Sequence, residues 1–133
     1  MGRTHTRATV DCSTTLPAER ASSGVARRFL NDVVGTGAQR DDTVDLDAAL
    51  LCVTELVSNA VLHAESKCQV RVQRDGSRLR VEVFDNRPDL LPTQQPYDPF
   101  ALTGRGLFLV ETLTDAWGVD VANDGKTVWF ELG

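Results

Sequence analysis

A single stretch, residues 45–63, constrains the fold more than any other part of the sequence. It reads DLDAALLCVTELVSNAVLH, and its bulky apolar residues recur every three or four positions, at Leu46, Leu50, Val53, Val57 and Val61. That is the period of a helix with one buried stripe. The sequence therefore predicts a long helix around which the remaining elements are organised.

A neighbouring stripe of this helix is polar. Glu55 and Asn59 lie one turn apart, and His63 follows one turn later. A carboxylate that can take a proton, beside an amide oxygen that can bind a hard cation, suits magnesium-assisted phosphoryl transfer. The alternative is a solvated helix face that carries one Glu and one Asn by chance, and these residues alone do not decide between the two.

Composition limits the class of protein. The 133 residues have room for one domain, and 41% hydrophobic with 25% charged residues are typical of a soluble globular protein. A net charge of −5, with no Lys/Arg-rich run, disfavours nucleic-acid binding. No apolar run reaches the roughly 20 residues that span a bilayer, and the N-terminus lacks an apolar signal core. We therefore expect a cytoplasmic protein without a membrane partner.

The cysteine pattern does not indicate a disulfide framework or a metal site. Cys12, Cys52 and Cys68 are odd in number and far apart, and His5 and His63 add no zinc-like cluster. We therefore expect reduced thiols, with Cys52 filling space in the core as a small hydrophobe.

The rest of the chain alternates short strands and helices. Asp75-Gly76 separates two runs of alternating apolar and polar residues, and Asn123-Asp124-Gly125 marks a second hairpin turn. A polar connection at 39–43 should supply the cap of the central helix. The other expected elements are a strand at 8–13, a helix at about 17–34 with Pro17 in its first turn, a short helix ending at Leu113, and strands at 117–122 and 127–132.

These elements predict an α/β fold. Helices interspersed among antiparallel strands indicate a two-layer α/β sandwich, with a mixed, mostly antiparallel sheet and helices on one face. We expect one domain over residues 8–133, preceded by a disordered N-terminus at residues 1–7. Residues 86–103 lack periodicity and hold four of the five prolines, which indicates a lid or a linker, and a chain with room for one domain favours the lid.

Two further segments carry candidate chemistry. Gly104-Arg105-Gly106-Leu107 precedes an apolar helix, so its free N–H groups could cradle phosphate, although a hinge explains the glycines nearly as well. Arg105 could reach a phosphate or an acidic partner, or be solvated. Asp85 ends a strand, where its carboxylate could accept a hydrogen bond from a purine amino group or could form a turn with Asn86.

Another segment, Gly125-Lys126-Thr127, looks like the end of a P-loop. The first glycine that a P-loop requires would fall at Asp120, and the segment lies in a strand hairpin, so we reject a Walker-type site.

In their order along the chain, these motifs resemble the ATP-binding domain of the GHKL family, which includes gyrase, sensor histidine kinases and MutL. Within it, the phrases ELVSNAVLHA, GRGLFLVETLTDAWG and GKTVWFEL are similar to the bacterial anti-sigma factor serine/threonine kinases of the RsbW and SpoIIAB type. The resemblance covers nearly all of the chain from about Pro17. It implies a Bergerat-type histidine kinase-like fold that binds ATP and Mg²⁺.

The resemblance also implies roles for individual residues. Asn59 would coordinate Mg²⁺, Glu55 would act as the catalytic general base, and Asp85 would bind the adenine. The turn from Gly104 through Arg105 and Gly106 to Leu107 would hold phosphates, and Thr127 would lie near the adenine. To His63 we assign only a packing or helix-end role.

One departure from the family pattern bears on affinity. The usual second motif is Asp-x-Gly-x-Gly, whereas Arg87 and Asp89 stand here where the glycines would be. Those glycines let the backbone approach the nucleotide closely, so we expect weaker ATP binding but the same fold.

The function expected from the resemblance is a serine/threonine protein kinase that phosphorylates an anti-sigma factor antagonist and otherwise sequesters a sigma factor, regulating transcription by partner switching. A homodimer is also suggested. The alternative is a non-enzymatic partner-binding module that has kept the fold with weak or no ATP binding. A sensor histidine kinase is disfavoured, because no helical segment with a phosphoacceptor histidine precedes Pro17.

Overall fold

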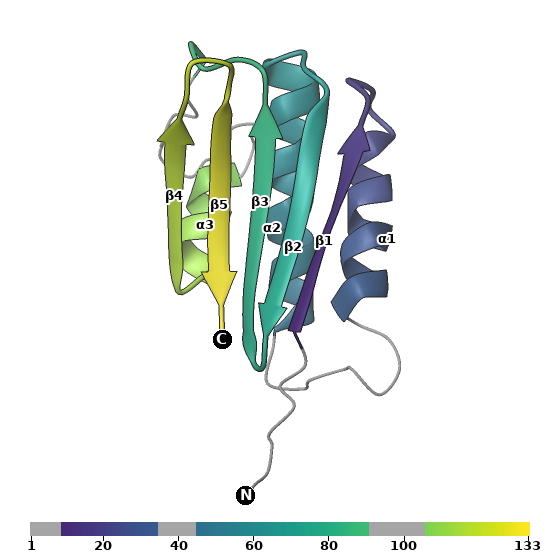
Figure 1. Ribbon diagram of the computed structural model, residues 1–133, viewed down its shortest axis with the longest axis vertical. Helices are drawn as coiled ribbons and strands as arrows, with labels where there is room; N and C mark the ends of the chain where they lie inside the picture. Colours follow the sequence, from purple (N-terminus) through teal and green to yellow (C-terminus); the bar gives the residue numbers. More distant parts are fainter. Residues whose placement is uncertain (1–8, 35–44, 91–105) are drawn as a thin grey trace, which may run out of the picture.

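The computed structural model describes residues 9–34, 45–90 and 106–133, so the expected disorder at residues 1–7 lies outside the described part of the chain. One sheet has the strand order β1-β2-β3-β5-β4, with every pairing antiparallel, and helices cover one of its faces (Figure 1). This is the predicted two-layer α/β sandwich, although the described sheet is antiparallel throughout instead of mixed. The elements are β1 (Thr9–Leu16), α1 (Ser22–Val34), α2 (Leu46–Ser58), the π-helical turn η2 (Asn59–His63), β2 (Cys68–Asp75), β3 (Arg78–Asp85), α3 (Gly106–Leu113), β4 (Ala116–Val121) and β5 (Lys126–Leu132).

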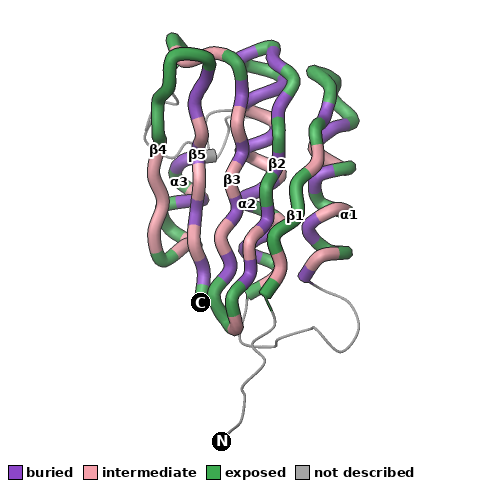
Figure 2. Tube along the Cα trace, viewed as in Figure 1, coloured by how far each residue is buried: buried purple, intermediate pink, exposed green. Residues whose placement is uncertain are grey.

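The core lies between the sheet and the helices. Buried and more exposed residues alternate along β2, β3 and β5, as the period-two pattern of the sequence predicts (Figure 2). From the central helix, Val53, Val57 and Val61 of the predicted stripe are buried, whereas Leu46 and Leu50 are only partly buried. Cys52 is also fully buried, which confirms its expected place in the core.

The central helix starts with its own cap. Asp45 is the N-cap, and its carboxylate accepts a hydrogen bond from the N–H of Ala48 at 3.0 Å. The segment 39–43, from which we expected the cap, lies outside the described residues. By length and composition the 18-residue helix Leu46–His63 could cross a membrane, but a core helix meets the same criteria, and this one packs against the sheet.

Two predicted boundaries are wrong. β1 continues beyond residues 14 and 15 to Leu16, because its ladder with β2 extends to the pair Leu16↔Cys68. α1 begins at Ser22 and not near Pro17, since the buried Ser22 hydroxyl donates to the Pro17 carbonyl at 2.7 Å and fixes a turn there. Pro17 therefore precedes the helix and is not part of its first turn.

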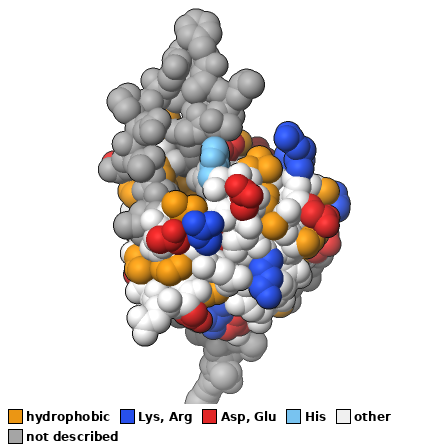
Figure 3. All heavy atoms as spheres, turned by 90° about the horizontal axis from the view of Figure 1, so that it is seen from above, with side chains coloured by type: hydrophobic (Ala, Val, Ile, Leu, Met, Phe, Trp, Pro, Cys, Tyr) orange, Lys and Arg blue, Asp and Glu red, His pale blue; other side chains and the backbone are white. Residues whose placement is uncertain are grey.

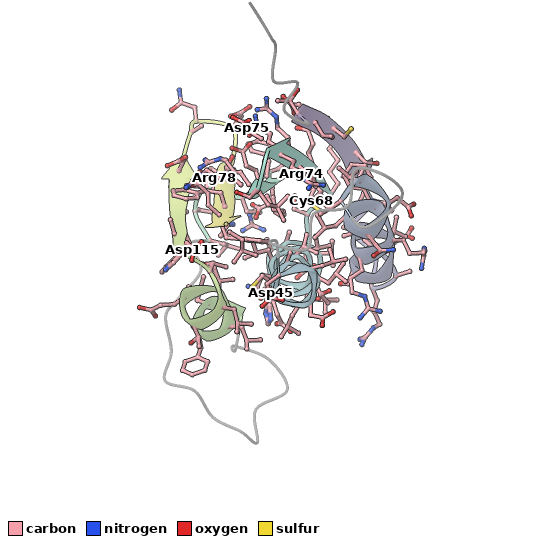
Figure 4. The ribbon with its side chains drawn as sticks, turned by 90° about the horizontal axis from the view of Figure 1, so that it is seen from below. Asp45, Cys68, Arg74, Asp75, Arg78 and Asp115 are labelled. Atoms are coloured by element: carbon pink, nitrogen blue, oxygen red, sulfur yellow. The ribbon has the colours of Figure 1, made fainter. Side chains whose placement is uncertain are left out.

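Several helices and strands begin or end at the same end of the sheet. α2 with η2 and β3 end there, and β5 begins there, at the top of Figure 1, whereas α3 lies lower, beside α2. Figure 4, seen from the opposite end, shows Asp45 at the start of α2 and Asp75 with Arg78 at the β2-β3 hairpin. The turn of that hairpin is Gly76-Ser77, in which Gly76 has a φ of 62° that favours glycine.

The burial of two of the cysteines predicts how the thiols differ in reactivity. It raises the pKa of Cys52 to about 12 and that of Cys68 to about 11, with smaller contributions from the Glu55 and Asp85 carboxylates, respectively. Because the thiolate is the reactive form, only the exposed Cys12 is expected to react with a thiol reagent at pH 8. Mass spectrometry after brief labelling should find one modification in the native protein and three after unfolding. Rapid native labelling of Cys52 would contradict this packing.

Candidate functional site

The polar stripe of the central helix ends in a widened turn. Glu55 and Asn59 are partly exposed on one face, and neither side chain has a hydrogen-bond partner within the described residues. From Asn59 onward the helix changes to π geometry, in which the Ala64 N–H donates to the Asn59 carbonyl at 3.0 Å. Such π turns inside α-helices are frequent at functional sites. The turn ends at His63, which is exposed and has only a helix-end position.

The segment after the π turn joins the central helix to the end of β3. Glu65 has a φ of 52°, which terminates the helix, and Ser66 behind it is buried. The Ser66 hydroxyl accepts a hydrogen bond from the Asn86 N–H at 3.0 Å. The backbone that follows Asp85 is therefore tied to the end of the helix that carries Asn59.

Asp85 itself is the last residue of β3 and is only 3% exposed. Both of its oxygens lie 2.9 Å from Nζ of Lys126, the first residue of β5, and Oδ1 also accepts the Arg87 N–H at 2.9 Å. Lys126 Nζ donates in addition to the Arg87 carbonyl at 3.0 Å. The carboxylate that we expected to bind adenine thus forms a buried ion pair, which the sequence analysis did not foresee.

Register explains why Lys126, and not Thr127, lies beside Asp85. Asp85 is paired with Lys126 across the β3-β5 ladder, whereas Thr127 is paired with Phe84. Opposed residues point to the same face of a sheet and consecutive residues to opposite faces. Lys126 therefore shares the helix-covered face with Asp85, and Thr127 lies on the other face.

The two residues that stand where the resemblance implies glycines bind each other. Arg87 donates to Asp89 through Nε at 3.1 Å and through a terminal nitrogen at 3.0 Å, and it also reaches the Ala64 carbonyl at 3.5 Å. The hydrogen bonds from Arg87 lower the pKa of the Asp89 carboxyl from its ordinary value. Both side chains are well exposed, so this pair orders the loop after β3 without contributing much stability.

On the other side of the site, α3 begins at Gly106, and its second residue Leu107 is buried. The helix thus includes the second of the two glycines that we expected to precede it, and it packs against α2, the helix that carries Glu55. Gly104, Arg105 and the greater part of the expected lid lie outside the described residues. Seen from this end (Figure 3), acidic, basic and apolar side chains of the described residues are intermingled without a patch of one charge.

This arrangement fits one part of a nucleotide complex better than the other. Mg²⁺ commonly takes one or two protein oxygens together with substrate phosphates and waters, so the Asn59 amide, which has no hydrogen-bond partner among the described residues, suits it. A group of three or more His, Cys, Asp or Glu side chains that could hold a metal alone is absent from the described residues. At the base end of the site, which is the part around Asp85 expected to bind the nucleobase, Lys126 is instead paired with the Asp85 carboxylate.

The hairpin that places Lys126 depends on a glycine. A Cβ at Gly125 would collide with the Asp85 carbonyl oxygen and the Phe84 ring, so Gly125→Ala must displace backbone. We expect a loss of about 1–3 kcal/mol in the free energy of unfolding, measured with urea. Gly24→Ala on α1, where a Cβ meets only a side-chain atom at 3.7 Å, is the matched control and should be neutral or stabilising. Equal stability of the two variants would contradict the tight hairpin.

Comparison with known proteins adds independent findings. Residues 16–132 match the family model of the histidine kinase-like ATPase domain. A crystal structure of the RsbU and RsbW domains of Rv1364c from Mycobacterium tuberculosis shares the fold, with a TM-score of 0.65 and 20% sequence identity. The match covers 92% of this chain and 32% of that longer chain. A comparison with curated proteins gives no match.

Proposed function

Because the chain belongs to the histidine kinase-like ATPase domain family, we propose that it is an ATP-binding and Mg²⁺-dependent protein kinase of the anti-sigma factor type. Its reaction is transfer of the γ-phosphoryl group of ATP to a serine or threonine hydroxyl of an antagonist protein. The observation that carries the proposal is the pair Glu55 and Asn59, one helical turn apart and both partly exposed on the central helix against which α3 packs, within a chain of this family.

Each of these groups has a distinct task. The Asn59 amide oxygen would hold Mg²⁺, which would supply positive charge to neutralise that of the phosphates. Glu55, one helical turn before Asn59, would accept the proton of the attacking hydroxyl. The free N–H groups at the start of α3 would bind phosphate oxygens, as helix N-termini do.

The partners follow from the same proposal. The substrate is an anti-sigma factor antagonist, and the unphosphorylated antagonist competes with a sigma factor for binding to this chain. The chain acts in the cytoplasm. The solved relative supports this proposal because its RsbW domain occurs beside an RsbU domain. A homodimer belongs to the same proposal.

A labelled-phosphate assay tests the kinase proposal. The purified chain is incubated with γ-labelled ATP, Mg²⁺ and candidate antagonist proteins encoded near it. Label on a serine or threonine of one antagonist, and its loss when Mg²⁺ is chelated, are the expected results. Absence of transfer to every candidate, despite measurable ATP binding, would contradict the kinase activity.

A second candidate function is a binding module that keeps the fold but does not use ATP. The buried Lys126–Asp85 pair favours this alternative, because the pair fills the base end of the site. The Arg87–Asp89 pair, which replaces the expected glycines, favours it as well. Under this alternative, partner proteins bind with the same affinity whether or not ATP and Mg²⁺ are present. Under the kinase proposal, nucleotide changes partner affinity.

A further inference from the structure

At the base end of the site, both oxygens of the Asp85 carboxylate are already paired. Lys126 Nζ lies 2.9 Å from both carboxylate oxygens, and each of the two side chains is only 5% exposed. Oδ1 also accepts the Arg87 N–H. Oδ2 keeps one acceptor position, but the carboxylate is buried and already paired, so a purine amino group would have to compete with the Lys126 ammonium for it.

Lys126 also holds the loop after β3. Its ammonium group donates to the Arg87 carbonyl at 3.0 Å, so the same three-proton donor binds the strand end and the first turn of the loop. Hydrogen bonds between ionised groups are roughly twice as strong as neutral ones. A neutral amino group of a base cannot displace the ammonium without other contacts from the rest of the nucleotide.

We infer that Lys126 is a built-in competitor for the nucleotide base: binding of the nucleotide displaces its ammonium group from Asp85 and releases the Arg87 carbonyl. This inference rests on the proposed nucleotide-binding function and adds the residue that limits affinity. Lys126 thereby couples occupation of the site to the loop that begins at Asn86. Removing the ammonium should make the folded protein less stable and nucleotide binding tighter, two effects of opposite sign.

The chain has only two lysines, which gives the test a matched control. Lys126→Met removes the competitor, Lys126→Gln keeps a neutral donor, and Lys67→Met removes the exposed lysine. Calorimetry with Mg²⁺ and ADP should show about tenfold tighter binding for both Lys126 variants and wild-type affinity for Lys67→Met. The melting temperature without nucleotide should fall on the order of 10 °C for Lys126→Met, by less for Lys126→Gln, which keeps a neutral donor, and not for Lys67→Met.

Labelling of the wild-type protein tests displacement even where a variant fails to fold. Acetic anhydride should modify Lys67 readily and Lys126 slowly, and saturating ADP should speed modification of Lys126 several-fold without changing Lys67. If the wild type binds ADP but the folded Lys126 variants bind it no more tightly, the inference is wrong. It is also wrong if Lys126 of the wild type stays protected from acetylation when ADP is bound. Neither result would contradict nucleotide binding itself. Absence of ADP binding in all the variants and in the wild type overturns the inference and, with it, the proposed nucleotide function.

Discussion

Asn59→Ala is expected to remove Mg²⁺-dependent ATP binding and phosphoryl transfer together. Asn59 offers its amide oxygen at the start of the π turn, and the described residues hold no alternative cluster of metal ligands. Without that oxygen the metal is held by phosphates and water alone, so transfer should fall on the order of 10²-fold or more. ATP titrations with and without Mg²⁺, beside single-turnover transfer, measure both effects.

The matched control is Asn31→Ala, which removes an exposed asparagine from α1 and should leave both quantities at wild-type values. Circular dichroism of the two variants should be equal, because the Asn59 side chain makes no hydrogen bond in the described residues. If Asn59→Ala keeps its Mg²⁺ dependence, the metal is held elsewhere.

Glu55→Gln is expected to separate binding from chemistry. The amide keeps the shape and hydrogen-bonding reach of the carboxylate but cannot accept the proton of the attacking hydroxyl. Transfer should fall on the order of 10²-fold or more, the usual contribution of a positioned base, while ATP affinity stays close to wild type. Single-turnover transfer beside equilibrium binding gives the two numbers.

Glu19→Gln, at an exposed position before α1, makes the same chemical change away from the site and should leave transfer unchanged. A Glu55→Gln protein that phosphorylates at the wild-type rate would show that another group, or water, takes the proton. Loss of ATP binding in the same variant would instead place Glu55 in nucleotide binding.

Local sequence patterns predicted the parts of this fold that depend on local physics. The stripe of Val53 and Val57 and the alternation along β2 and β3 reflect periods of 3.6 and 2, which a chain must show to bury one face. The start of α3 at Gly106 follows from a glycine before an apolar run. Where one hydroxyl decides, as Ser22 does by binding the Pro17 carbonyl, the preference of proline for the first helical turn placed the helix start too early.

The π turn and the role of Lys126 could not be predicted from such patterns. A π turn adds one residue to a helical turn, which apolar spacing over five residues does not reveal. Lys126 meets Asp85 only through the register of β3 against β5, a contact across 41 positions of sequence. The available signal is the period of two along β5, which places Lys126 on the same face as the buried Val128 and Phe130.

Calorimetric titration of the wild-type chain with ATP and with GTP, each in the presence of Mg²⁺, tests the central claim most directly. The account predicts saturable binding of one ATP per chain and much weaker binding of GTP, because the Asp85 carboxylate, once released by Lys126, would accept from the amino group that adenine carries at its six-position and guanine lacks. Chelation of Mg²⁺ should weaken ATP binding. Absence of heat with ATP at every concentration up to the millimolar range, by a protein with a native circular dichroism spectrum, would contradict nucleotide binding by this chain.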